Sequence, residues 1–534
     1  MVVTEDRNEF DVVIVGAGFG GLYALYKLRV AGFSVRVFEA APDVGGTWYW
    51  NRYPGARCDV ESVDYSYSFS PELEQDWHWS ARYATQPEIL SYLRHVAERF
   101  DLRRDIQFDT RVVGLAYDAD RSRWTVRTDR GDAVSSQFCV MATGCLSTAQ
   151  MPDLPGAADY RGRIFHTGTW PGPVDFSGQR VGVIGTGSSG IQVTPEVAAQ
   201  ADRVVVFQRT PNFTLPARDG PLDPAIEAEF KANYRERRAA AERSPGGLPT
   251  ARPTVGVSDV DESERAAILE RAWELGGNAM QLTFTDLLVD ETTNGVVSEF
   301  MRSKIREVVE DPRVAELLCP KDYPFGAKRV CKDTDYYETF NRSTVTLVDL
   351  RTEPLVGLYE SGLRTAKADY ELDSIIYATG FDALTGTLLR MDIVGRDGVR
   401  LADAWAEGPE TYLGLMVAGI PNMFVVTGPG SPSVLTNMVA AIEQHVDWIA
   451  ECVTRLRDQG YNSIEPSSDA QSDWVANANE VAARTLYMKA SSWYLGANIA
   501  GKPRVFMPYV GGLDRYREIC DEVVTAGYKG FLLS

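Results

Sequence analysis

Two glycine-rich motifs constrain the fold of this chain more than any other feature of its sequence. Both have the form G-x-G-x-x-G, at residues 16–21 and 185–190, and each follows an apolar run, at 11–15 and 181–184. In such a motif the first glycine makes a tight turn, the second lets a pyrophosphate approach the backbone, and the third lets the next helix pack on the strand. The sequence therefore predicts an α/β protein with two Rossmann-like dinucleotide-binding domains. The expected contacts are Gly16, Gly18, Gly21, Gly185, Gly187, Ser188 and Gly190.

The residue 23 positions after the first glycine of each motif distinguishes the two sites. It is Glu39 in the first, where a carboxylate can bind the hydroxyls of an adenosine ribose. It is Gln208 in the second, and the next residue is Arg209. A guanidinium binds a 2′-phosphate that a carboxylate would repel. We therefore expect FAD at the first site and NADPH at the second, an arrangement in which a nicotinamide reduces a flavin.

Composition excludes several classes of partner. The net charge of -20 over 534 residues argues against nucleic acid and against an anionic membrane surface. The longest apolar run, 412–427, is interrupted by glycine and proline, so no membrane span is expected, and residues 1–10 lack the pattern of a signal peptide. The seven cysteines have no metal-ligand spacing, which predicts no metal site and a cytoplasmic protein. The oligomeric state is left open, and a monomer is compatible with the sequence.

The order of the motifs predicts a nested arrangement of domains. Apolar strands at 138–141 and 374–377 both run into Ala-Thr-Gly, which we interpret as the points where the chain passes between the two nucleotide domains. Residues 221–329 are highly charged, and their helical periodicity, for example at 226–230 and 264–270, predicts a helical insertion. The expected domains are FAD-binding at 1–150 and 385–534, NADP-binding at 151–220 and 330–384, and the insertion at 221–329.

The segment 45–59 follows Glu39 and indicates the class of flavoprotein. Its paired glycines allow backbone contact with a flavin nucleotide, and we expect Gly46, Thr47 and Trp48 to contribute. A flavin disulfide reductase would need two redox cysteines here, but only Cys58 is present. Asp59 ends the segment; by its residue type alone, a place in a surface turn is the more common outcome.

A second segment, 160–171, resembles the fingerprint of type I Baeyer–Villiger monooxygenases. The matching positions are Tyr160, Gly162, His166, Trp170 and Pro171; the family usually has Phe where this chain has Tyr160. The segment 45–59 is also similar to a motif of that family. With both glycine motifs and both Ala-Thr-Gly strands, the resemblance covers nearly the whole chain, and it is greatest to the cyclohexanone, phenylacetone and steroid monooxygenase group.

The resemblance implies roles for residues that the sequence alone would not single out. Arg329 matches the active-site arginine of the family, and Asp59 matches the carboxylate that holds it. Arg209, Thr210 and Lys328 match contacts of the NADPH 2′-phosphate, and Trp493 matches a tryptophan on a mobile segment that closes over nicotinamide and substrate. The implied substrate contacts are Leu146, Ser433, Val434, Leu435 and Trp493. By residue type, Lys328 and Arg329 would be a surface basic pair and Trp493 a core aromatic. His166 is expected to couple the domains rather than to act as an acid or base.

The implied reaction is an NADPH- and O₂-dependent conversion of ketones to esters or lactones. In the family that this chain resembles, oxygen adds to the reduced flavin as a C4a-peroxyflavin, which attacks a cyclic, aryl or steroid-like ketone. Two alternatives stay open. A flavin monooxygenase that hydroxylates nitrogen or sulfur shares both nucleotide folds, and product analysis with a cyclic ketone separates the two reactions. A sensor of NADPH or flavin without enzymatic activity would not consume NADPH when a ketone is supplied.

Overall fold

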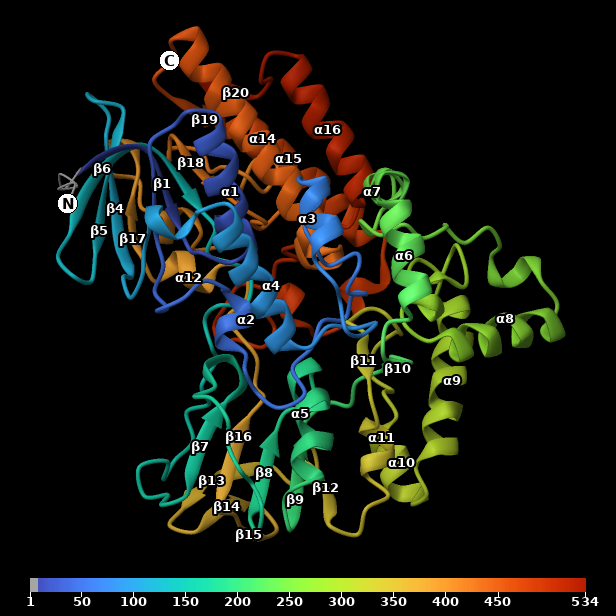
Figure 1. Cartoon of the computed structure of the whole chain (residues 1–534). Coiled ribbons are helices and arrows are strands. Elements are labelled where there is room, and N and C mark those ends of the chain that lie inside the picture. Colours follow the sequence, from blue (N-terminus) through green and yellow to red (C-terminus); the bar gives the residue numbers. More distant parts are fainter. Residues whose placement is uncertain (1–7) are drawn as a thin grey trace.

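The computed structural model describes residues 8–534, and its larger sheet carries the first glycine motif (Figure 1). The strand order is β17-β4-β5-β6-β1-β2-β3, and β18 pairs with β6. Strands β1, β2 and β6 are parallel, whereas β4, β5 and β6 form an antiparallel meander. The strands are β1 (Glu9–Val15), β2 (Val35–Phe38), β3 (Ile106–Gln107), β4 (Val112–Asp118), β5 (Arg123–Thr128), β6 (Ala133–Met141), β17 (Asp392–Val394) and β18 (Met423–Val425).

Helices cover this sheet, so its central strand is apolar on both faces. Val12, Val13 and Ile14 of β1 are fully buried, as expected for a parallel strand between two layers. The helix that follows the first motif, α1, packs against α14. A Cβ on Gly21 would lie 1.8 Å from the carbonyl oxygen of Gly16, so only glycine permits this close turn. The helices of this region are α1 (Phe19–Val30), α2 (Thr47–Trp50), α3 (Pro71–Asp76), α4 (Gln86–Arg99), α12 (Gly386–Leu389), α13 (Leu401–Ala404), α14 (Met438–Gln459), α15 (Ser468–Ala483) and α16 (Leu513–Thr525).

The second motif lies in a five-stranded sheet in which every pairing is parallel. Its strand order is β12-β9-β8-β16-β7, and α5 (Ser188–Ala198) packs against β8 and β9. The turn repeats the first one, because a Cβ on Gly190 would lie 2.1 Å from the carbonyl oxygen of Gly185. The strands are β7 (Arg163–His166), β8 (Arg180–Ile184), β9 (Arg203–Gln208), β12 (Val345–Asp349) and β16 (Ser374–Tyr377). A separate antiparallel sheet contains β13 (Leu355–Tyr359), β14 (Gly362–Thr365) and β15 (Asp369–Glu371).

The strand pairing confirms the nested arrangement. The chain leaves the larger sheet after β6, builds the five-stranded sheet, and returns to the larger sheet with β17 and β18. Both Ala-Thr-Gly segments directly follow the expected strands, β6 and β16. The fold class is therefore as predicted, with two Rossmann-like units, one inserted in the other; the residue boundaries of the domains stay a prediction.

The helical insertion lies to one side of both sheets (Figure 1). The predicted helices are present as α6 (Pro224–Ala232), α7 (Tyr234–Glu242), α8 (Glu262–Leu275), α9 (Glu291–Val308) and α10 (Pro312–Leu318). The chain enters and leaves this region through two short parallel strands, β10 (Thr214–Pro216) and β11 (Cys331–Asp333). No helix within residues 8–534 is both long and apolar enough to cross a membrane. Residues just before β11, among them Arg329, lie in the wall of a cavity that residues of both nucleotide-binding units also line.

Candidate active site

A cavity of about 1180 Å³ connects the two glycine motifs. Residues from both sheets, from the helical insertion and from the C-terminal region line it, so it forms only when all four are assembled. Many of the residues expected from the sequence lie in its wall: Gly16, Gly18, Glu39, Gly46, Thr47, Trp48, Asp59, Leu146, Gly185, Gly187, Ser188, Arg209, Thr210, Lys328, Arg329, Val434 and Trp493. Gly21 and Gly190 do not line the cavity, because they pack the turns described above.

Backbone amides orient the carboxylate of Glu39. One oxygen accepts from the amide of Ala17 at 2.6 Å and the other from the amide of Ala41 at 2.8 Å. The residue is 5% exposed, and burial raises the pKa of its carboxyl group. Each carboxylate oxygen accepts more than one hydrogen bond, so Glu39 keeps capacity for two ribose hydroxyls. The backbones of Gly46 and Gly18 approach each other closely in the cavity wall, because a Cβ on Gly46 would lie only 3.0 Å from the Cα of Gly18.

The second site has no carboxylate at the position that Glu39 occupies in the first. Gln208 occupies the position of the acidic residue, but it is fully buried and donates to the carbonyl of Leu317 in α10 at 2.7 Å. Its side chain therefore contacts the helical insertion and not the cavity. The next residue, Arg209, lines the cavity with Thr210. Gly187 has no atom within 4 Å of the place where a Cβ would stand, which leaves the N-terminus of α5 open.

Lys328 is the second cation at this end of the cavity. Its Nζ lies 4.4 Å from the centre of the Tyr323 ring. Burial, and then the charge of Arg209, lower the pKa of Lys328 to about 8. Each of these two positive charges disfavours the other. An anion bound between them would stabilise both charged side chains.

Arg329 and Asp59 form an ion pair in the wall of the cavity. The Nε of Arg329 donates to Oδ2 of Asp59 at 2.9 Å, and Nη1 donates to the carbonyl of Val434 at 3.3 Å. Burial disfavours the charged guanidinium, but Asp59 outweighs it and raises the pKa of Arg329. The side chain of Asp59 is 10% exposed and that of Arg329 is 36% exposed. Asp59 is therefore a buried, paired carboxylate rather than a residue of a surface turn, and Arg329 presents a permanent cation to the cavity.

The predicted substrate contacts divide into two groups. Leu146, Val434 and Trp493 line the cavity. Ser433 and Leu435 are not in its wall: Ser433 is fully buried behind it, and its hydroxyl donates to the carbonyl of Thr427 at 3.2 Å. The 3-10 turn Ser433–Leu435 explains the difference, because it directs successive side chains to different sides.

The five matching residues of the fingerprint segment lie outside the cavity wall and connect parts of the fold, whereas Gly168 and Thr169 of the same segment line the cavity. His166 ends β7; its Nδ1 accepts from the amide of Gly168 at 2.9 Å, and burial lowers the pKa of the imidazole. The amide of Trp170 donates to the carbonyl of Trp50, in the segment 45–59, at 3.2 Å. Tyr160, Gly162 and Pro171 are also absent from the cavity wall. The hydroxyl of Tyr160 donates to the carbonyl of Leu372 at 2.9 Å, which accommodates the departure from Phe.

The segment around Trp493 is bound to the residues that directly follow the second Ala-Thr-Gly. Trp493 begins a 3-10 turn, Trp493–Leu495, and its ring lies 4.5 Å from that of Tyr494. The Nζ of Lys502 is 2.6 Å from a carboxylate oxygen of Asp382, and Asn498 donates to the carbonyl of Phe381 at 2.7 Å. The position of Trp493 therefore depends on the place where the chain passes back between the two nucleotide-binding units.

Comparison with known proteins identifies the family. Residues 9–219 match the FMO-like family, described as flavin-binding monooxygenase-like. A protein of Pseudooceanicola batsensis named Baeyer-Villiger monooxygenase is 42% identical over 528 residues, which cover 98% of this chain and 96% of the relative. The chain belongs to the Baeyer–Villiger monooxygenases. A solved structure of oxidized steroid monooxygenase bound to NADP is 55% identical, with a TM-score of 0.94, and the match covers 98% of this chain and 99% of that chain.

One relative of this chain is named for a different oxidation. A phenazine N-monooxygenase of Lysobacter antibioticus is 40% identical over 536 residues, which cover 100% of this chain and 98% of the relative. Similarity of the whole chain therefore does not separate oxidation at carbon from oxidation at nitrogen, and the two must be separated by the site and by product analysis.

Sequence reasoning missed several residues in the cavity wall of this Baeyer–Villiger monooxygenase. Tyr65, Cys145 and Thr427 line it, and Trp48 donates its indole N–H to the Tyr65 hydroxyl at 3.2 Å. Cys145 directly follows the first Ala-Thr-Gly, and Thr427 directly precedes the loop 428–435. Their positions next to these motifs could have predicted that Cys145 and Thr427 line the cavity. No motif lies next to Tyr65, which is in a segment without regular structure.

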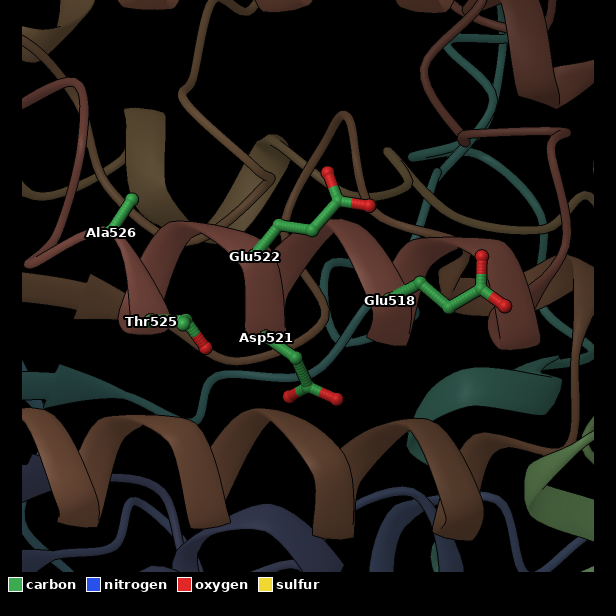
Figure 2. A pocket seen from close by; sticks show the side chains of 5 residues that line it. All are labelled: Glu518, Asp521, Glu522, Thr525 and Ala526. Carbon is green, nitrogen blue, oxygen red and sulfur yellow. The ribbon is translucent and has the colours of Figure 1, made fainter.

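A second hollow lies on the exposed surface of α16, and Figure 2 shows the side chains that line it. Three of its five residues are the carboxylates Glu518, Asp521 and Glu522, and Arg515 pairs with two of these. Neither glycine motif contributes to it. Within residues 8–534 no group of His, Cys, Asp and Glu could hold a metal ion. The cavity between the glycine motifs is therefore the candidate active site of this monooxygenase.

Proposed function

We propose that this Baeyer–Villiger monooxygenase uses FAD, NADPH and O₂ to convert ketones to esters or lactones. The observation that carries the proposal is the Arg329–Asp59 pair, in the wall of a cavity that reaches both glycine motifs. The solved relative named as a steroid monooxygenase, at 55% identity, supports cyclic and steroid-like ketones, with aryl ketones as the further candidates.

The residues of the first motif fit FAD. The Gly18–Gly46 cradle would hold the pyrophosphate at the N-terminus of α1, and Glu39 would accept the ribose hydroxyls. Thr47 and Trp48 line the continuation of this space toward Asp59. When bound and reduced by NADPH, the flavin supplies the activation of O₂, which is chemistry that amino-acid side chains lack.

The residues of the second motif fit NADPH. Gly185, Gly187 and Ser188 would hold its pyrophosphate at the N-terminus of α5, next to the open space at Gly187. Arg209, Thr210 and Lys328 would contact the 2′-phosphate, and the two cations account for a preference for NADPH over NADH.

Arg329 would act as the electrostatic catalytic residue. An oxygen atom that attacks a ketone carbonyl carries negative charge, and the carbonyl oxygen becomes an oxyanion. The guanidinium stays charged and can donate to either atom, while Asp59 and the carbonyl of Val434 fix its plane. Trp493 would exclude water from this end of the cavity. Leu146 and Val434 would contact the substrate directly, with Ser433 and Leu435 supporting the loop behind them.

Product analysis tests this proposal against nitrogen or sulfur oxidation. The purified flavoprotein is incubated with NADPH under ¹⁸O₂ and supplied separately with cyclohexanone, phenylacetone, progesterone, a tertiary amine and a sulfide. We expect one labelled oxygen in an ester or lactone from at least one ketone, with less oxide from the sulfide. Oxidation of the amine or the sulfide without any ester would contradict the proposal and favour a hydroxylating monooxygenase.

We also propose that the protein is cytoplasmic. The support is the absence of disulfide bonds among the seven cysteines, all of which are buried.

A further inference from the structure

Two residues next to the active site adopt a backbone conformation that non-glycine residues rarely have. Thr427 has a φ of 55° and Ser433 a φ of 43°, both in the left-handed region. Such conformations cost free energy and persist only where surrounding contacts determine them. The two residues bracket a loop, which we define here as the anchored loop, residues 427–434. The contacts that hold it therefore matter for the cavity wall to which it belongs.

His445 supplies the first anchor. The imidazole is fully buried on α14, and its Nδ1 accepts the backbone N–H of Thr427 at 2.8 Å. Cys145 supplies the second, because its sulfur lies 3.3 Å from the Thr427 hydroxyl and 3.2 Å from the Ser433 hydroxyl. The Ser433 hydroxyl also donates to the Thr427 carbonyl at 3.2 Å, so a hydrogen bond joins the two ends of the loop.

The anchored loop in turn holds the guanidinium of Arg329. The carbonyl of Val434, one residue after Ser433, accepts from Nη1 of Arg329, and this contact is separate from the pairing with Asp59. A displacement of the loop would leave Arg329 with one anchor instead of two. It would also move Thr427 and Val434, which both line the cavity.

We propose that His445 is a positioning residue, which fixes the anchored loop through Thr427 and thereby orients Arg329 and the substrate wall. The inference rests on the proposed function, because it assigns His445 to the oxygen-transfer step of that reaction. His445 touches neither cofactor nor substrate space, since it lies behind the cavity wall.

The hydrogen-bond arrangement of His445 supports a positional role. Because Nδ1 is an acceptor, the proton resides on Nε2, and this buried atom has no partner among residues 8–534. Burial, with the charge of Arg517 adding to it, lowers the pKa of His445 to about 3, so the ring stays neutral in the pH range of the reaction. An unpartnered buried N–H is costly. A phenylalanine would remove that cost but would leave the buried Thr427 N–H without its acceptor, so the hydrogen bond to Thr427 is what accounts for the histidine.

The test compares substitutions that differ in where they place an acceptor. His445→Phe removes it and keeps the volume. His445→Asn places an amide oxygen near the position of Nδ1, whereas the longer His445→Gln places it toward Nε2. Cys452→Ala is the matched control, since Cys452 is fully buried two turns along the same helix. Each variant is purified with FAD, and the ester formed per NADPH, the KM values for ketone and NADPH, the FAD content and the Tm are measured.

We expect His445→Phe and His445→Gln to lower the ester formed per NADPH about tenfold and to raise the ketone KM, with FAD content and the NADPH KM close to wild type. His445→Asn should recover most of the loss, and Cys452→Ala should change only the Tm. Wild-type ester yield and ketone KM in His445→Phe, or in His445→Gln should the first variant not fold, would overturn the inference. An equal loss in His445→Asn and His445→Gln would also overturn it.

A failure of the proposed function would give a different pattern. In that case the wild-type protein itself would form no ester from any ketone. Hydrogen exchange then still tests the anchor, because the amide of Thr427 should exchange faster in His445→Phe than in wild type. Unchanged exchange across residues 427–434 would overturn the inference without reference to the reaction.

Discussion

Arg329 and Asp59 are 270 residues apart in the sequence, and a hydrogen bond of 2.9 Å joins the Nε of one to Oδ2 of the other. Asp59 follows α2 in the unit that carries the first glycine motif, and Arg329 precedes β11, where the chain returns from the helical insertion. The pair therefore exists only when both parts are docked. The guanidinium is therefore held in the cavity only when the helical insertion is docked on the unit that carries the first glycine motif.

Coenzyme preference should depend on Arg209. Arg209→Ala removes a charge-assisted contact with the 2′-phosphate, and such a hydrogen bond contributes about 1.5–3 kcal/mol. We expect kcat/KM for NADPH to fall roughly tenfold or more, with far less change for NADH. Arg203→Ala, at the other end of β9, is the control and should affect neither coenzyme. Equal losses with both coenzymes would show that Arg209 does not bind the phosphate.

The affinity for NADPH should fall above about pH 8. In the free protein the pKa of Lys328 is lowered to about 8, so the ammonium is charged below that pH and neutral above it. A bound 2′-phosphate stabilises the charged form and raises this pKa, so binding takes up protons above pH 8 and weakens there. Titration of NADP⁺ binding between pH 7 and 9.5 measures the effect. Lys328→Met should bind more weakly and lose the pH dependence, and a flat profile in wild type would contradict the assignment.

The segment that carries Trp493 should become more ordered when NADP⁺ binds. The Lys502–Asp382 ion pair joins this segment to the residues after β16, where the chain leaves the NADP-binding unit, so a ligand that stabilises that unit should also stabilise the segment. Hydrogen exchange of residues 487–505 should slow with NADP⁺, and α6 and α7 should serve as an unaffected reference. Lys502→Met should remove most of the added protection. Equal exchange with and without NADP⁺ would reject this coupling.

The fold was largely predictable because its determinants are local. The turns at Gly16 and Gly185 require glycine for backbone reasons, and the strand and helix on either side of each follow from apolar pattern. The nested order followed from the two Ala-Thr-Gly strands. The short strands β10, β11 and β13–β15 were not predicted, because three to five residues carry too little periodicity to distinguish a strand from a loop.

The site was less predictable because its contacts are distant in sequence. Spacing gave Glu39 and Arg209, but it could not show that Gln208 turns toward α10. The pairing of Asp59 with Arg329 came from a family resemblance, since residue types alone favoured exposed positions for both. The bond between His445 and Thr427 had no signal at all, because it joins a helix interior to a loop whose backbone conformation the sequence does not reveal.

Arg329→Ala should separate the two halves of the reaction, which are the oxidation of NADPH and the transfer of oxygen to the ketone. The variant should keep its FAD and still oxidise NADPH, because neither glycine motif includes the arginine. Loss of one electrostatic donor at a developing oxyanion typically costs 10²–10³-fold, roughly 2.7–4 kcal/mol, so oxygen transfer should fall by about that factor. Arg329→Lys should rescue little, because an ammonium cannot reproduce the planar contacts with Asp59 and Val434. Asp59→Ala should show a milder form of the same loss.

The most direct measurement is the yield of ester per NADPH consumed by Arg329→Ala, with hydrogen peroxide quantified in the same reaction. Arg313→Ala, on the exposed surface of α10 with a side chain 90% exposed, controls for the loss of a positive charge. We predict that Arg329→Ala releases hydrogen peroxide in place of ester while Arg313→Ala matches wild type. An ester yield per NADPH near wild type in Arg329→Ala would contradict both the role of the arginine and the significance of its pairing with Asp59.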